Sequence, residues 1–303
     1  MKKILIATTA LVLTAGVAAA DVALSGSARM GVVNDSANKG NETQFTSRVR
    51  ISGTGSGTTD GGLTFGASYR FDQNGGNASG TANGDSTVFL SGEFGKITMG
   101  DVGGAADALV GQVGGVGLTG LGDHNEIGFI GTTKTAAYYE KAVGSLTFGL
   151  GLGQPGKTNP GEMSVGAKYA TDKFSVALGY EAFKTGAGTA ASKSESLISL
   201  KGTATLGAAT VQAKYVSDSR TNHDASYALS VGGTFGGVAV TAFYAAHGDT
   251  TAAGKDGDTA IGLGASYDLG GGASVVGGVA QITGNATGAK ARTQADVGVS
   301  FTF

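Results

Sequence analysis

Four arginines in the first quarter of the chain are spaced so that their side chains can form one basic patch. Arg48 and Arg50 are two residues apart, so both lie on the same face if their segment is a β-strand. Arg29 and Arg70 occupy the corresponding alternate positions of the neighbouring segments. Such a cluster attracts anions and repels cations, but it offers neither a nucleophile nor a general base.

Acidic residues follow in a glycine-rich segment, about residues 102–133, that interrupts the otherwise regular pattern of the chain. Asp107, Asp123 and Glu126 lie within this segment and Asp101 stands at its start. A loop of this length without secondary structure is uncommon and is usually functional. Because the segment also carries apolar residues, we expect it to pack against an inner wall, with its carboxylates facing the arginines. Opposed charges of this kind would create a transverse electric field.

The three histidines, His124, His223 and His247, fall in loops and show no spacing typical of metal ligands. His223 lies near Asp218 and Asp224, which leaves an enzyme with a histidine–carboxylate pair as an alternative. The chain contains no cysteine, so no disulfide framework is expected. We expect no catalytic residues and no organic cofactor.

The elements that must position these charges are β-strands, because apolar and polar residues alternate through most of the chain. The last strand shows it clearly: Ala295, Val297, Val299, Phe301 and Phe303 alternate with small or polar residues. The sixteen alternating segments are Val22–Val32, Thr43–Thr54, Leu63–Asp72, Thr87–Phe94, Ile97–Asp101, Lys134–Val143, Leu146–Gly153, Glu162–Ala170, Phe174–Phe183, Glu195–Leu206, Ala209–Val216, Ala225–Phe235, Val238–Ala246, Thr259–Leu269, Ala273–Thr283 and Thr293–Phe303.

Tight turns and long polar loops alternate between these segments, as they do in transmembrane barrels. The sequence therefore predicts an all-β fold, a sixteen-stranded antiparallel transmembrane β-barrel in which the long third loop folds inward. Aromatic residues lie toward strand ends, as in the girdles of outer-membrane barrels, whereas a soluble sandwich would place them in mid-strand. The other face is small and polar, and a barrel of this size leaves an aqueous interior. Three inward lysines, Lys168, Lys201 and Lys214, are expected to extend the basic patch.

The N-terminus has the pattern of a secretory signal peptide. Lys2 and Lys3 precede the apolar stretch Ile4–Ala18, and Ala18–Ala20 provides the small residues of a cleavage site. Cleavage after Ala20 divides the chain into a signal peptide, 1–20, and a barrel domain, 21–303. The whole chain has a net charge of −2 and no basic run, which argues against a nucleic-acid partner.

Four stretches resemble the general porins of alphaproteobacteria, the Rhodobacter type. They are Asp21–Val32, Phe89–Asp101, Gly115–Asp123 and Val299–Phe303. The resemblance extends over the whole chain after the signal peptide, and the run from Phe89 into the glycine-rich segment is its most specific part.

This resemblance implies a homotrimer in the cell outer membrane, with one pore in each barrel and the third loop as its constriction. It assigns Asp101, Asp107, Asp123 and Glu126 to the acidic side and Arg29, Arg48, Arg50 and Arg70 to the basic side. It also implies calcium near the loop carboxylates, although the loop is poorer in acids than a strongly calcium-loaded constriction requires. Phe303 would be the signal read by the barrel-assembly machinery, and lipid and lipopolysaccharide would surround the barrel.

We therefore expect a channel for passive passage of small hydrophilic solutes and ions, filtered by size and charge at the third loop. A solute-specific channel is the alternative within transport, and it would need a line of aromatics or a ladder of arginines along the lumen. A barrel enzyme is a further alternative, for which His223 is the one candidate.

Overall fold

The computed structural model describes residues 21–75, 81–82, 85–132, 135–155, 162–185, 193–250, 256–284 and 290–303. The predicted signal peptide, residues 1–20, lies outside this part of the chain. The strands are β1 (Asp21–Asp35), β2 (Thr43–Thr58), β3 (Thr64–Gly75), β4 (Thr81–Ala82), β5 (Ser86–Gly92), β6 (Gly95–Gly100), β7 (Ala136–Val143), β8 (Leu146–Leu152), β9 (Met163–Ala170), β10 (Phe174–Thr185), β11 (Lys193–Leu206), β12 (Ala209–Asp218), β13 (Ser226–Phe235), β14 (Val238–His247), β15 (Asp258–Gly270), β16 (Ala273–Gly284) and β17 (Arg292–Thr302), and the one described helix is α1 (Ala105–Val110).

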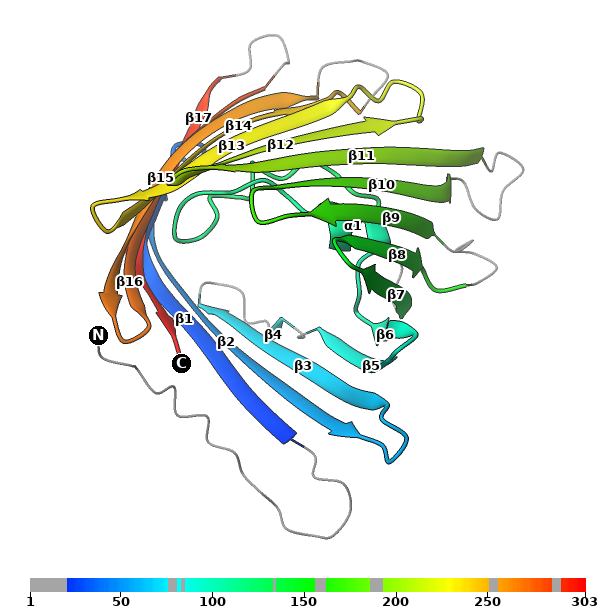
Figure 1. Ribbon diagram of the computed structural model, residues 1–303. Coiled ribbons are helices and arrows are strands. Elements are labelled where there is room, and N and C mark those ends of the chain that lie inside the picture. Colours follow the sequence, from blue (N-terminus) through cyan, green and yellow to red (C-terminus); the bar gives the residue numbers. More distant parts are fainter. Residues whose placement is uncertain are drawn as a thin grey trace.

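These strands form a single antiparallel sheet that closes on itself (Figure 1). β1 pairs with β2 on one side and with β17 on the other. At this seam the backbone amide of Gly26 donates to the carbonyl of Phe303 at 2.7 Å, and the amide of Phe303 donates back at 3.0 Å. Because β4 is only a two-residue piece beside β3, the predicted sixteen-stranded antiparallel barrel is confirmed. Among the described helices, none has the length and apolar character needed to cross a membrane.

Tight turns alternate with longer connections around the barrel, as the sequence predicts. β7 and β8 are joined by Gly144–Ser145, and β11 and β12 by Gly207–Ala208. Both turns begin at a glycine with positive φ, 60° and 62° respectively. Two-residue hairpin turns require this left-handed backbone at their first central position, where glycine has no side chain to oppose it. The short turns therefore follow from glycine placement that is visible in the sequence.

The outer face of the barrel is apolar and exposed. Leu24, Val49, Leu150 and Leu200 are all exposed although their strands are fully paired. Aromatic side chains of the predicted girdle, such as Tyr69 and Tyr267, share this exposure. An exposed apolar belt of this extent is unfavourable in water and suits a hydrocarbon solvent.

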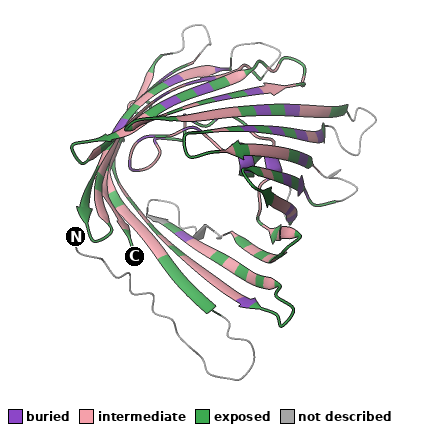
Figure 2. Cartoon of the chain, viewed as in Figure 1, coloured by how far each residue is buried: buried purple, intermediate pink, exposed green. Residues whose placement is uncertain are grey.

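The buried residues lie inside the barrel, between the wall and the long connection from β6 to β7. This connection, described from residue 101 to 132, crosses the interior in Figure 1 and begins with α1 rather than being structureless throughout. Figure 2 shows buried residues concentrated on the strands that this loop covers, whereas the wall of β1 and β2 is mostly exposed or intermediate. The loop contributes Val113, Leu121 and Ile127 to the main apolar cluster, and the wall contributes Leu197 and Phe243.

Candidate functional site

Helix α1 lies on a row of glycines inside the barrel. Gly149 of β8, Gly166 of β9 and Gly179 of β10 are neighbours in the strand register. A Cβ atom at Gly179 would lie 2.6 Å from the Cβ of Ala106, and one at Gly166 would lie 2.8 Å from the carbonyl oxygen of Ala105. The helix can therefore rest directly on the sheet backbone because these three positions carry no side chain.

The same region supplies a hydrogen-bond partner for the start of the helix. Gly104, the N-cap residue, has no side chain to accept from the first helical amides. Instead the amide of Ala105 donates to Oγ of Ser164 on β9 at 2.7 Å. The wall therefore caps α1 and fixes its position.

Lys214 of β12 holds the middle of the loop. Its side chain is only 2 % exposed, and Nζ donates to Oε1 of Gln112 and to the carbonyl of Ile127, each at 2.7 Å. The ammonium group also lies 3.7 Å from the ring centroid of Phe129, a cation–π contact. Lys201 donates to the carbonyl of Gln112. Both lysines thus bind loop atoms rather than lining the passage.

Asp296 of β17 holds the next part of the loop and is 6 % exposed. Its Oδ1 accepts from the amide of Leu118 at 2.9 Å, and its Oδ2 accepts from the amide and the hydroxyl of Thr119, each at 2.6 Å. The carbonyl of Leu118 in turn accepts from Nη1 of Arg29 at 2.9 Å. We call Asp296, Leu118 and Arg29 the seam latch, because they join the loop to both strands at which the barrel closes.

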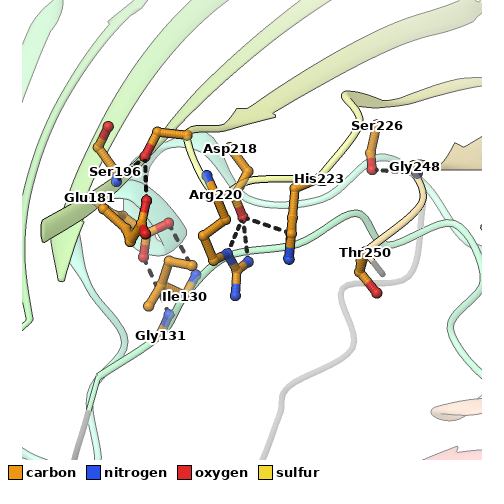
Figure 3. Close-up of polar contacts among 12 residues, drawn as sticks. Ile130, Gly131, Glu181, Ser196, Asp218, Arg220, His223, Ser226, Gly248 and Thr250 are labelled. Atoms are coloured by element: carbon orange, nitrogen blue, oxygen red, sulfur yellow. Dashed lines mark hydrogen bonds and ion pairs between the residues drawn. The ribbon is translucent and has the colours of Figure 1, made fainter. Parts of the chain in front are cut away.

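Glu181 of β10 and His247 of β14 hold the loop from Glu126 to Gly131. Glu181 of β10 accepts from the amides of Ile130 and Gly131 at 3.2 and 3.3 Å, as Figure 3 shows. His247 of β14 places Nε2 at 2.9 Å from the carbonyl oxygen of Glu126. Its other ring nitrogen lies 2.6 Å from Oδ1 of Asp258.

Three of the four predicted acids lie on this loop with exposed side chains. The packing of the loop against the wall thus leaves Asp107, Asp123 and Glu126 uncovered. Glu126 is exposed as a whole, but its carboxyl group is partly removed from water. This partial burial, and next the neighbouring charge of Asp123, raises the pKa of Glu126 above its usual range. Asp101, at the start of the loop, is hydrogen-bonded to the carboxyl group of Asp85. Burial, and next this hydrogen bond, raises the pKa of Asp85.

The four predicted arginines lie side by side on β1, β2 and β3. Arg50 binds Asp72 through two hydrogen bonds of 2.7 and 2.8 Å. Arg70 contacts the same carboxylate at 3.3 Å and Asp85 at 2.6 Å. Arg48 is directly opposite Arg29 in the β1–β2 register. The structure thus brings the predicted basic residues together on one wall.

Electrostatic interaction links the two sets across the lumen. The carboxylate of Asp123 acts on both Arg29 and Arg48. Glu126 and Asp107 interact instead with Lys214, which lies behind the loop. Of the three exposed acids, Asp123 is therefore the one whose charge acts on the arginine wall.

The expectation for the three inward lysines is wrong. Lys168, Lys201 and Lys214 do not extend the basic patch, because β9, β11 and β12 are separated from β1–β3 by several strands around the barrel. Asp296, Glu181 and Ser164 were not expected to be partners of the loop. Their alternate positions along the strands place their side chains inside the barrel. No local sequence pattern, however, distinguishes a loop partner from any other polar residue of the lumen.

The candidate catalytic histidine belongs to a network of ion pairs. His223 places Nδ1 at 3.2 Å from Oδ2 of Asp218, and the same carboxylate binds Arg220, whose Nε lies 2.7 Å away (Figure 3). The guanidinium group also lies 5.4 Å from the ring centroid of Phe183. These contacts tie the connection after β12 to the barrel.

Comparisons with known proteins agree with this architecture. The sequence profile of a family described as Gram-negative porin matches residues 7–287. A porin of Rhodobacter capsulatus is 36% identical over 294 residues, covering 86% of this chain and 94% of that protein. A solved porin structure refined at 1.8 Å resolution aligns with a TM-score of 0.75 and 34% identity, covering 93% of this chain and 100% of that one. A mutant of the Rh. blastica porin aligns with a TM-score of 0.72 and 25% identity, covering 93% of this chain and 100% of that one.

Proposed function

The chain belongs to the family of Gram-negative porins and forms an outer-membrane diffusion channel, and we propose that its selectivity arises between the third loop and the arginine wall. Small hydrophilic solutes cross the barrel through the space that the loop leaves open. The wall arginines Arg29, Arg48, Arg50 and Arg70 and the loop acids Asp107, Asp123 and Glu126 would then act as a charge filter, with Asp101 at the start of the loop.

One observation carries this proposal: an inward-folded loop presents exposed carboxylates to a lumen whose facing wall carries four adjacent arginines. Fixed charges of opposite sign on two sides of a passage produce a field across it. Such a field favours solutes that can align a dipole, and the balance of the two signs sets ion selectivity. Size is limited by the loop itself, which is held to the wall along its length.

The test is the reversal potential of the purified channel in a planar bilayer under a salt gradient. Replacing Arg48 and Arg50 with glutamate reverses two wall charges, so we expect selectivity to shift toward cations. Lys168→Glu is the matched control, because it reverses a charge on β9, several strands away from the arginine wall. A reversal potential that does not move in Arg48→Glu/Arg50→Glu, or moves equally in the control, would contradict the filter.

Assembly and export belong to the same proposal. We infer a homotrimer, supported by the family and by an exposed apolar groove on β17, β1 and β2 that is lined by Met30, Val32, Phe45 and Val299. Conductance steps in threes would support it. We also infer cleavage of the signal peptide after Ala20, recognition of the exposed Phe303 by the barrel-assembly machinery, and contact with lipopolysaccharide.

Calcium remains a prediction drawn from the family. No three histidine or carboxylate side chains of the described residues are arranged to hold a metal ion. Passage through the channel as proposed does not depend on calcium. We also propose that the protein has no catalytic activity; the carboxylate that contacts His223, Asp218, also binds Arg220 in an ion pair.

A further inference from the structure

The four arginines of the wall differ in how their charges are compensated. Asp72 binds both Arg50 and Arg70, and Asp85 binds Arg70 as well. Neither Arg29 nor Arg48 forms an ion pair with any described residue. The positive charge of the wall is therefore neutralised by direct ion pairs on the β3 side. On the β1 side carboxylates act only at longer range, Asp296 and Asp123 on Arg29 and Asp72 and Asp123 on Arg48.

The hydrogen-bonding capacity of Arg29 and Arg48 is also largely unused. Arg29 donates one hydrogen bond, from Nη1 to the carbonyl of Leu118 at 2.9 Å. The Arg48 side chain donates none to the described residues, and the Nε atoms of both arginines are buried without a partner. A guanidinium group carries five N–H donors in a rigid fork. The buried Nε donors are out of reach of the lumen, but the Nη groups of Arg48 and Nη2 of Arg29 have no partner among the described residues and remain for a ligand.

The pair is also close. Arg29 and Arg48 are directly opposite each other on adjacent antiparallel strands, which places their Cβ atoms about 5 Å apart. Like charges at such a position repel and destabilise the sheet. An anion held between the two groups would relieve this repulsion and would occupy the free donors at the same time.

From these observations we propose that Arg29 and Arg48 form a binding subsite for small oxyanions, with inorganic phosphate as the representative ligand. Oxyanions fit because each guanidinium fork can donate two parallel hydrogen bonds to two oxygens of one anion. Chloride has no such pair of acceptors and gains only the charge interaction. The proposal rests on the proposed function, because it needs both arginines in the path of permeating solutes.

The subsite must be weak for the channel to conduct. A permeating ion has to bind well enough to enter and loosely enough to leave. Asp123 supplies the opposing influence, because its exposed carboxylate interacts with both arginines from the loop side. An oxyanion at the pair therefore meets attraction from the wall and repulsion from the loop, which favours brief occupancy over trapping.

The experiment measures single-channel conductance of the purified full-length channel in potassium chloride, with potassium phosphate added at constant ionic strength. We expect phosphate to lower the chloride current in a saturable way, since an occupied subsite obstructs other anions. In Arg29→Gln and in Arg48→Gln, the phosphate concentration for half of this effect should rise by roughly tenfold or more, as expected for the loss of charged hydrogen bonds. Lys168→Gln, which removes a charge from β9, should keep the wild-type value.

The outcomes separate this subsite from the general filter. If phosphate has no saturable effect on the wild-type channel while Arg48→Glu/Arg50→Glu still shifts the reversal potential, the subsite is overturned and the filter stands. If Lys168→Gln weakens the phosphate effect as much as the arginine variants do, the effect reflects total lumen charge and the subsite is again overturned. If neither measurement responds to the wall arginines, both proposals fail.

Discussion

Arg29 and Arg48 face each other across β1 and β2 with no carboxylate between them. In a sheet selected only for stability, an opposite charge or an uncharged residue would stand at one of these positions. The wall immediately beside them shows the alternative, since Asp72 binds both Arg50 and Arg70. We infer that this pair, which has no direct ion-pair partner, acts on passing ions.

The first prediction concerns the seam latch. Asp296→Ala removes the acceptor for the amides of Leu118 and Thr119, and each buried donor left without a partner costs about 1–3 kcal/mol. We expect residues 117–119 to detach from the wall, which should appear as rapid current fluctuations and weaker ion selectivity in bilayer recordings.

The control for this change is Asp268→Ala. Asp268 is an exposed aspartate near the β15–β16 turn, and its Oδ1 accepts a hydrogen bond from the amide of Gly270 at 2.8 Å. We expect Asp268→Ala to leave the current fluctuations and the ion selectivity at their wild-type values. If the current of Asp296→Ala fluctuated no more than that of this control, the position of the loop would not depend on the seam latch.

The second prediction concerns the glycine row beneath α1. Gly179→Val places side-chain atoms where the Cβ alone would already lie 2.8 Å from the Cα of Ala106. Overpacking of this kind costs about 1–3 kcal/mol, and the helix can relieve it only by moving into the lumen. We therefore expect a smaller single-channel conductance.

Gly202→Val provides a matched comparison on the neighbouring strand, because a Cβ at Gly202 meets no atom within 4 Å. Both variants exchange glycine for valine in a strand, so they share the effect on strand propensity. Equal conductance in the two variants would mean that α1 does not rest on Gly179.

The third prediction concerns pH. Because the pKa of Glu126 is raised by burial and by Asp123, its carboxyl group gains a proton at a higher pH than an ordinary glutamate. As the pH falls from neutral, cation selectivity should therefore decline earlier in the wild type than in Glu126→Gln, which has no charge to lose there. Reversal potentials across a pH series measure this difference, and identical pH profiles would rule out a role for Glu126 in selectivity.

The raised pKa of Glu126 also determines how its contribution to stability changes with pH. A raised pKa in the folded state means that burial penalises the charged form of Glu126. The associated stabilisation is therefore fully present below the ordinary glutamate pKa and is lost as the pH rises through the raised value. Mild acid should hold the loop at least as firmly as neutral pH, as far as Glu126 is concerned.

Much of the fold could be predicted from local patterns. Alternation of apolar and polar residues, as in Ala295 to Phe303, fixes which face of a strand meets lipid, and turn glycines such as Gly144 mark the strand ends. Alternation also placed Arg29, Arg48, Arg50 and Arg70 inside. The barrel is predictable because each of these signals acts within a few residues of the chain.

The contacts that hold the loop could not be predicted in the same way. Asp296 and Thr119 are 177 residues apart in the chain, and no local pattern links them. Lys214 was expected to line the passage because its parity is inward, but inward residues on β12 lie under the loop rather than beside the lumen. The division of the arginines into paired and unpaired members depends likewise on where Asp72 and Asp85 come to lie.

The seam latch also bears on the order in which the barrel assembles. Leu118 is held by Asp296 of the last strand and by Arg29 of the first, so its site is incomplete until β1 and β17 have met. Contacts between such distant parts of a chain form late, because a large loop must close first. Until then the loop near Leu118 lacks these two anchors, so the final position of this part of the constriction is coupled to closure of the cylinder.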